Sequence, residues 1–156
     1  MAESRRRERI HTGRLDEPRR HLDRVDLAGF IGADAVLVPA LSPNSGLVHR
    51  KISFNERPAI TLAANVTVRD GKIERARLAV GSIGIAAQRL TGAEESLHGL
   101  DASDPRRTHL DQCLEVAGRE AEPVQDANGS IEYKRQLVRV LVERCVREAL
   151  LEAQAP

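Results

Sequence analysis

The sequence predicts an α+β fold, in which a small antiparallel sheet of three to four strands packs against three helices. Two stretches support this prediction. One has apolar residues at every second position on both sides of an Asp-Gly pair, and the other, near the C-terminus, repeats apolar residues at helical spacing. Each stretch has only one apolar face, so we expect the helices and the sheet to cover each other.

A long hairpin is expected over residues 59–81. Every second residue is apolar from 60 to 68 and again from 76 to 80, which places these side chains on one face of each strand. Asp70 and Gly71 separate the two runs, and both residue types tolerate the positive φ of a two-residue hairpin turn. A lone hairpin is marginally stable in water, so its apolar face needs a cover.

Two segments before the hairpin complete the predicted domain. Residues 47–54 are expected to add a strand, and the apolar run 35–38 is typical of a strand end. Residues 1–33 are expected to form a disordered, Arg-rich leader because they have few large apolar side chains and no apolar stripe. We therefore predict a leader over 1–33 and one folded domain over 34–153.

Three helices are predicted after the hairpin. The first covers about residues 88–97 and ends near Gly99, a residue suited to a helix C-terminus. The second is expected to begin with Asp104 as N-cap and Pro105 as its first residue. The third, over 131–153, is the strongest prediction, and its apolar stripe must dock because an isolated helix gains little stability from propensity alone. The stripe consists of Leu137, Leu141, Val142, Cys145, Val146 and Ala149.

Composition and motifs argue against several functional classes. Aromatic residues make up 2% of the chain and the net charge is +1, so a nucleic-acid interface is not expected in the folded part. Cys113 and Cys145 match no metal or redox spacing, and small buried side chains are the simpler reading. No apolar run reaches transmembrane length and no secretory signal is present, which predicts a cytoplasmic protein. No nucleotide-binding, metalloprotease or serine-hydrolase motif occurs.

The compact cationic group His49-Arg50-Lys51 is the main candidate site in the predicted domain. It could contact an anionic group, such as a cofactor pyrophosphate, the electron-rich edge of a flavin or the carboxylates of a partner. It could equally be a solvated edge strand protected by charge, and the residues alone favour this second interpretation. Asp101, Asp104 and Asp126 lie where turns or helix caps are needed, and we interpret them so.

Several residues form a pattern that extends over the predicted strand, the hairpin and the last predicted helix. They are Lys51, Ala76 to Gly81, Asp126, Gly129, Ser130, Glu132 to Arg135, Leu137, Val140 to Val142 and Arg144. With this pattern the chain resembles the C-terminal domain of the FAD-binding medium subunit in the carbon monoxide dehydrogenase / xanthine dehydrogenase family of molybdenum hydroxylases. The resemblance covers about residues 34–153, and its most specific part is the segment that leads into the last predicted helix.

This resemblance implies a role in an oxidoreductase. In such enzymes a molybdenum-containing large subunit oxidises the substrate, a small subunit with [2Fe–2S] clusters passes on the electrons, and FAD in the medium subunit receives them. The C-terminal domain is a three-stranded sheet with a three-helix bundle that adds a few contacts near the flavin. By resemblance, Lys51 and its neighbour Arg50 are the expected cofactor-binding residues, and no catalytic or metal-binding residue is expected.

The chain also departs from the family pattern. It has no counterpart of the glycine-rich "AGGTDL" and "TIGGN" loops that hold the flavin, and His49 replaces an aromatic residue two positions before Lys51. We therefore expect a docking module with at most a peripheral flavin contact, which is not catalytic by itself. The alternative is a stand-alone protein-interaction module, for example a homodimer, without catalytic activity. Nucleic-acid binding through the leader is the weakest hypothesis, and no membrane partner is expected.

Overall fold

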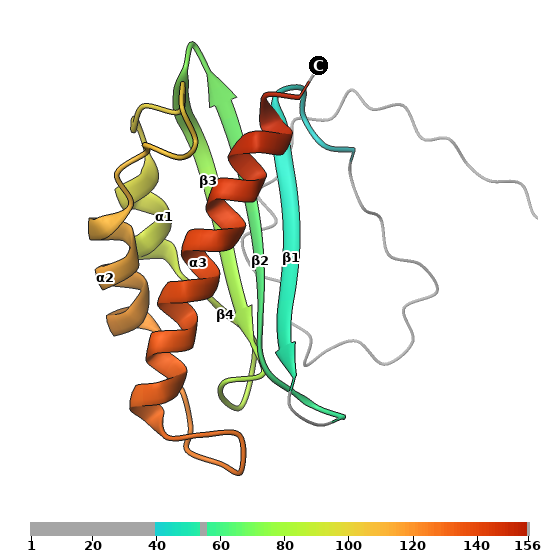
Figure 1. The fold of residues 1–156 in the computed structure, drawn as a ribbon, viewed down its shortest axis with the longest axis vertical. Coiled ribbons are helices and arrows are strands. Elements are labelled where there is room, and N and C mark those ends of the chain that lie inside the picture. Colours follow the sequence, from blue (N-terminus) through green and yellow to red (C-terminus); the bar gives the residue numbers. More distant parts are fainter. Residues whose placement is uncertain (1–39, 54–55, 156) are drawn as a thin grey trace, which may run out of the picture. The chain divides into compact units, whose positions relative to one another are not determined.

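The fold was determined as a computed structural model, and it describes residues 40–53 and 56–155. Its elements are β1 (Ser45–Ser53), β2 (Pro58–Arg69), β3 (Lys72–Gly81), β4 (Gln88–Arg89), α1 (Thr91–Leu97), α2 (Asp111–Glu120) and α3 (Ile131–Ala153). The four strands form one antiparallel sheet in the order β1-β2-β3-β4, and the helices lie together on one side of it (Figure 1). This arrangement confirms the predicted α+β fold.

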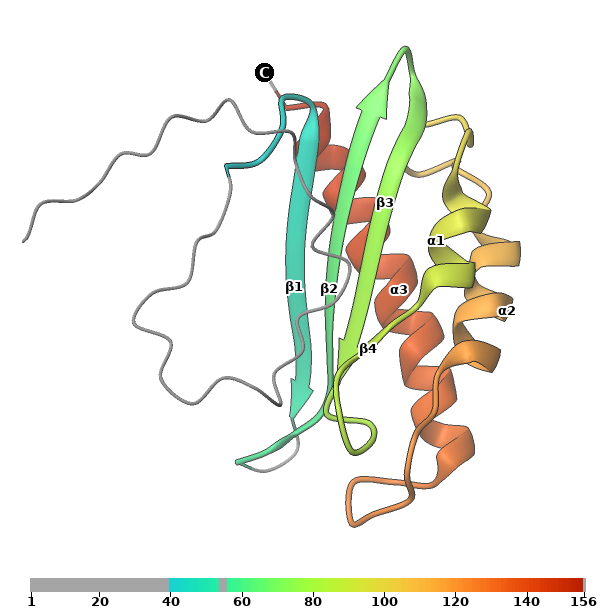
Figure 2. The same cartoon turned by 180° about the vertical axis from the view of Figure 1, so that it is seen from behind.

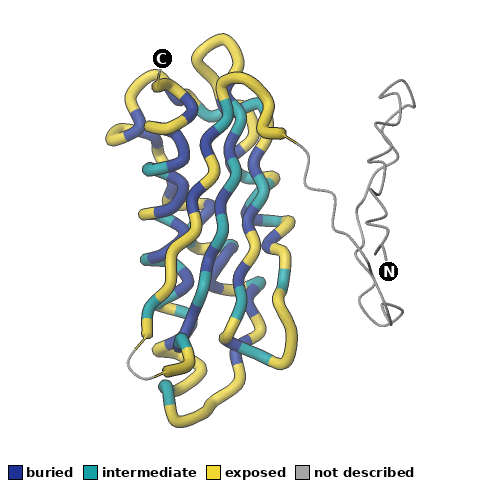
Figure 3. The backbone as a smooth tube through the Cα atoms, turned by 90° about the vertical axis from the view of Figure 1, so that its right-hand side faces the viewer, coloured by how far each residue is buried: buried dark blue, intermediate teal, exposed yellow. Residues whose placement is uncertain are grey.

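The hairpin of β2 and β3 is the centre of the sheet, as predicted. Its turn consists of Asp70 and Gly71, which have φ values of 51° and 71°. The register pairs Ala64 with Leu78 and Leu62 with Val80, and these four side chains are buried. The alternation of buried and exposed positions along the strands can be followed in Figure 3.

The strand predicted before the hairpin is confirmed as β1. It pairs with β2 from Ser45 opposite Thr67 to Ser53 opposite Pro58. Phe54 and residues 1–39 lie outside the described residues, so the leader over 1–33, the strand end at 35–38 and the domain start at 34 stay predictions.

The first two helices begin later than predicted. Residues 88–89 pair with β3 as strand β4, so α1 starts only at Thr91. The prediction that Asp104 caps the second helix is wrong, because α2 starts at Asp111 after Leu110. The Asp104 carboxylate instead accepts a hydrogen bond from the Arg106 amide, 3.0 Å away, within a separate turn. An Asp side chain that accepts a hydrogen bond from the backbone amide two residues later can stabilise an isolated turn just as it can stabilise the start of a helix.

Helix α3 matches its prediction and lies across β1 and β2, whereas α1 lies beside β3. The core between helices and sheet is aliphatic, and Cys113 and Cys145 are buried in it as expected. One charged residue of α3, which is not part of the predicted apolar stripe, also lies in the interior. Lys134 is completely buried, with 0% of its surface exposed.

Candidate interaction surface

One face of the sheet has no described helix against it, as Figure 2 shows, and we call it the open face. Its side chains alternate with the buried ones, and residues paired between strands share the face. The open face consists of Ser45, Leu47, His49 and Lys51 of β1, Thr61, Ala63, Asn65 and Thr67 of β2, Arg75, Arg77, Ala79 and Gly81 of β3, and Arg89 of β4.

The charges on the open face all have the same sign. Lys51 lies on β1, and Arg75 and Arg77 lie on β3, with His49 as a further nitrogen donor. None of these four side chains has a hydrogen bond or ion pair within the part of the chain that the structure describes. Arg89, at the far edge, is held by the carboxylate of Glu94. None of the residues named for the open face carries a carboxylate, and Glu74, at the hairpin end of β3, pairs with Arg69 over 3.0 Å. The named part of the open face therefore attracts anionic groups.

Small side chains occupy the middle of the open face. His49 on β1 lies opposite Ala63, which lies opposite Ala79 on β3. Gly81 lies opposite Thr61, and a Cβ at this glycine would come within 2.7 Å of the Thr61 hydroxyl oxygen. The long cationic side chains therefore flank a strip where another molecule can approach the sheet closely.

The two predicted cofactor-binding residues point to opposite faces of the sheet. Lys51 is exposed on the open face, whereas Arg50 lies on the helix side, where its Nε is 2.9 Å from Oε2 of Glu148 in α3. The hydrogen bond to Glu148 raises the pKa of the Arg50 guanidinium above its ordinary value. Arg50 thus connects β1 to α3, whereas the Lys51 ammonium has no partner among the described residues and can meet an anion there. Their role as cofactor contacts stays a prediction.

Sequence reasoning overlooked the cations of β3. The alternation that assigned Ala76, Leu78 and Val80 to the core also assigns Arg75 and Arg77 to the other face, so the signal was present. What the strand pattern alone could not supply is the register, which places these two arginines on the same surface as Lys51.

The family motif before α3 forms a structural connection rather than a site open to a ligand. The buried Nζ of Lys134 donates to the Val124 carbonyl oxygen and pairs with Oδ2 of Asp126, each at 2.7 Å. The other carboxylate oxygen of Asp126 accepts from the Asn128 amide, and Ser130 caps α3 by accepting from the amide of Tyr133. The turn interpretation of Asp126 is therefore confirmed, with an added ion pair that lowers the pKa of its carboxyl.

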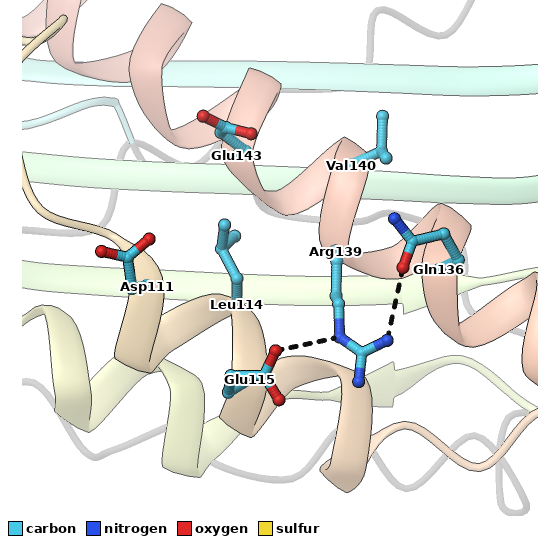
Figure 4. A pocket seen from close by; sticks show the side chains of 7 residues that line it. All are labelled: Asp111, Leu114, Glu115, Gln136, Arg139, Val140 and Glu143. Atoms are coloured by element: carbon cyan, nitrogen blue, oxygen red, sulfur yellow. Dashed lines mark hydrogen bonds and ion pairs between the residues drawn. The ribbon is translucent and has the colours of Figure 1, made fainter.

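A second surface feature is a depression of about 210 Å³ between α2 and α3 (Figure 4). Two of its three carboxylates have partners within the described residues: Glu115 lies 3.7 Å from the guanidinium of Arg139, and Glu143 accepts from Arg147, whereas Asp111 is the third. The Arg139 side chain runs past Gly118, where a Cβ would come within 2.6 Å of its Nε. These contacts connect two helices, and we assign them a structural role.

Three further properties characterise the described ranges 40–53 and 56–155. They contain no cluster of three or more His, Cys, Asp or Glu side chains that could hold a metal ion. Burial raises the pKa of the Cys113 and Cys145 thiols to about 11, so neither is a ready nucleophile. None of the described helices combines the length and the apolar character needed to cross a bilayer.

Comparisons with known proteins agree with this architecture. Over 88 residues the chain is 31% identical to the medium subunit of nicotine 6-hydroxylase from Paenarthrobacter nicotinovorans, which covers 56% of this chain and 30% of that subunit. The fold of this chain is similar to that of a chain of CO dehydrogenase from Oligotropha carboxidovorans. The TM-score is 0.64 and the identity is 21%, and the match covers 73% of this chain and 40% of the CO dehydrogenase chain.

CO dehydrogenase from Hydrogenophaga pseudoflava shows the same similarity, with a TM-score of 0.64, 21% identity and coverage of 76% and 40%. The chain thus spans less than half the length of the relatives that it matches. The family model of the CO dehydrogenase flavoprotein C-terminal domain matches residues 50–149, which includes β2, β3, β4, α1 and α2, the last four residues of β1, and α3 up to residue 149. The chain therefore belongs to the family of the CO dehydrogenase flavoprotein C-terminal domain.

Proposed function

We propose that the described residues form a docking module that places its open face against a flavin-binding protein chain. The observation that carries this proposal is the surface itself. Lys51, Arg75 and Arg77 present three positive charges that have no partner among the described residues, around a strip of small side chains on the sheet of a domain that belongs to a flavoprotein family. A partner with carboxylates or another anionic group at its contact surface would neutralise them.

Within this proposal Lys51 is the residue that approaches the cofactor. Its ammonium and the His49 ring supply N–H donors at the β1 side of the open face, and Ala63, Ala79 and Gly81 leave room for a flat ring. This donor set suits contact with one side of an FAD molecule that the docked chain holds. Bound there, FAD would supply electron transfer between the redox centres of a molybdenum hydroxylase. Arg50 has a positioning role, because its ion pair with Glu148 fixes β1 on α3.

Charge also separates this proposal from its alternative, a homodimer through the open face. Two copies joined there would bring Lys51, Arg75 and Arg77 of each protomer against the same cations of the other, with no carboxylate among the residues named for the face to compensate. Such like-charge contacts oppose association. The open face therefore favours an acidic partner over a second copy.

The first test is a titration of the purified full chain with FAD, followed by absorbance. We expect no tight one-to-one complex, because the described residues contact only one side of the cofactor. Tight stoichiometric binding by the chain alone would contradict the proposal that a partner holds the flavin.

The second test is affinity purification of the tagged full chain from its source cells, followed by flavin, molybdenum and iron analysis of the recovered complex. The triple variant Lys51→Glu/Arg75→Glu/Arg77→Glu should lose the flavin-containing partner. Arg144→Glu, which reverses one exposed cation on α3, is the matched control and should retain it. Recovery of neither flavin nor metal with the unmodified chain would refute the proposal.

A further inference from the structure

The outer edge of β1 is a second surface that could bind a partner. In the sheet order β1-β2-β3-β4 this strand is at the end, and no described strand pairs with its outer side. It is nine residues long, and His49, Arg50 and Lys51 are exposed in its middle. A strand edge of this length presents a row of main-chain groups on which another extended segment can pair.

The structure identifies which main-chain groups face outward. The Leu47 amide does not bond to β2, because it donates to Oε2 of Glu152 in α3 over 3.1 Å. Outward and inward groups alternate along an antiparallel strand, so the amides and carbonyls of His49 and Lys51 also face outward. No hydrogen bond from these two amides to a described group is present. Among these three outward amides, that of Leu47 has a described acceptor, and this acceptor is a carboxylate.

The side chains of this edge select the charge of an added strand. His49 and Lys51 lie on one face of β1 and both are unpaired within the described part of the chain, whereas Arg50 on the other face already pairs with Glu148. A second copy added edge to edge would bring its own cluster of cations alongside this one, which is destabilising. Carboxylates opposite His49 and Lys51 would be stabilising.

We propose that the outer edge of β1 binds an extended acidic segment of a partner protein by strand addition. The segment presents carboxylates beside His49 and Lys51, and apolar side chains on the opposite face beside Val48 and Ile52. Main-chain hydrogen bonds to residues 49 and 51 supply the pairing, as in other strand-addition complexes. This surface is the edge of the sheet rather than its open face, and the proposal does not depend on a flavin partner.

The test uses synthetic peptides of one length and opposite charge, EVEVEVE and KVKVKVK, with the 15N-labelled full chain. We expect EVEVEVE to bind, with chemical-shift changes centred on the amides of His49 and Lys51 and slower hydrogen exchange at both. Each favourable cross-strand charge pair should change the affinity by about 1.4-fold to fivefold. KVKVKVK should bind at least several-fold more weakly, and Lys51→Glu should reduce or reverse this preference.

Two controls separate strand addition from simple charge attraction. An EVEVEVE peptide N-methylated at the amides that face β1 keeps its charge and should lose binding. His49→Pro removes an outward N–H without breaking the β1–β2 ladder, which prolines at sheet edges permit, and should also lose it.

Several outcomes would overturn the proposal. They are equal binding of both peptides, unchanged binding after N-methylation, and no binding of EVEVEVE at millimolar concentration. A concentration-dependent dimer with the 49 and 51 amides protected in the absence of peptide would also overturn it, because a second copy would then occupy the edge. None of these outcomes bears on docking through the open face.

Discussion

Replacement of Lys134 by Met should destabilise the domain far more than replacement of any exposed lysine. Lys134 is completely buried, and its ammonium makes two contacts of 2.7 Å, one to the Val124 carbonyl and one to Asp126. Methionine has a similar length and keeps most of the buried aliphatic stem, so the change removes mainly the charged hydrogen bonds. A hydrogen bond that involves a charged group contributes about 1.5–3 kcal/mol, because its loss leaves a desolvated partner behind.

The expected loss of unfolding free energy is about 2 kcal/mol. It falls below the 3–5 kcal/mol typical of a broken buried ion pair, because 44% of the Asp126 side chain is exposed and water can solvate it after the change. Urea unfolding followed by far-UV circular dichroism measures this loss directly. Lys72→Met, at an exposed lysine, is the matched control and should stay within about 0.5 kcal/mol of the original protein. If Lys134→Met lowered the unfolding free energy by less than about 0.5 kcal/mol, the assignment of a structural ion pair would be refuted.

The same pair predicts how stability depends on acid. The hydrogen bond from Lys134, with that from the Asn128 amide, lowers the pKa of the Asp126 carboxyl below its ordinary value of 3.8. A group with a lowered pKa in the folded state stabilises the fold above its unfolded pKa, and this contribution disappears as the pH falls through the folded pKa. We expect stability to fall below about pH 4, and Asp126→Asn to remove part of that slope in urea titrations between pH 2 and 6. An identical slope in the variant would contradict the pairing.

Three further predictions concern the core and the contact between α3 and β1. Gly46→Ala should cost about 2 kcal/mol or more in urea unfolding, because the added Cβ would overlap the Ala149 carbonyl and the two elements would have to separate. Leu62→Ala, in the buried row of β2, should cost about 2–5 kcal/mol in the same assay. Cys113 and Cys145 should not react with Ellman's reagent at pH 8 until the protein unfolds, because both thiols are buried with pKa values of about 11; rapid reaction of the native protein would show that they are accessible.

The candidate surface was only partly visible in the sequence. The sequence predicts the cationic group on β1, but as a single site that includes both residues 50 and 51, whereas neighbours in a strand point to opposite faces. Arg50 meets Glu148, which is 98 residues away in the sequence, and no local pattern predicts such a pair. The arginines of β3 join Lys51 only through the register of two successive strand pairs.

The sequence by itself determined the hairpin, its turn and the last helix, because each rests on local rules. Alternation sets the buried face of a strand, Asp-Gly sets the turn, and a long apolar stripe sets the helix. It also determined the family, through motifs within residues 50–149.

The tertiary structure decided what depends on distant neighbours. It moved the start of α2 to Asp111, because the Asp104 carboxylate closes a separate turn, and it buried Lys134, because Val124 and Asp126 from the preceding loop supply partners for its charge. It also decided which cations have a partner within the part of the chain that the structure describes. The physical reason is common to all three: the energy of a polar or charged side chain depends on the groups that folding brings beside it, and these come from other parts of the chain.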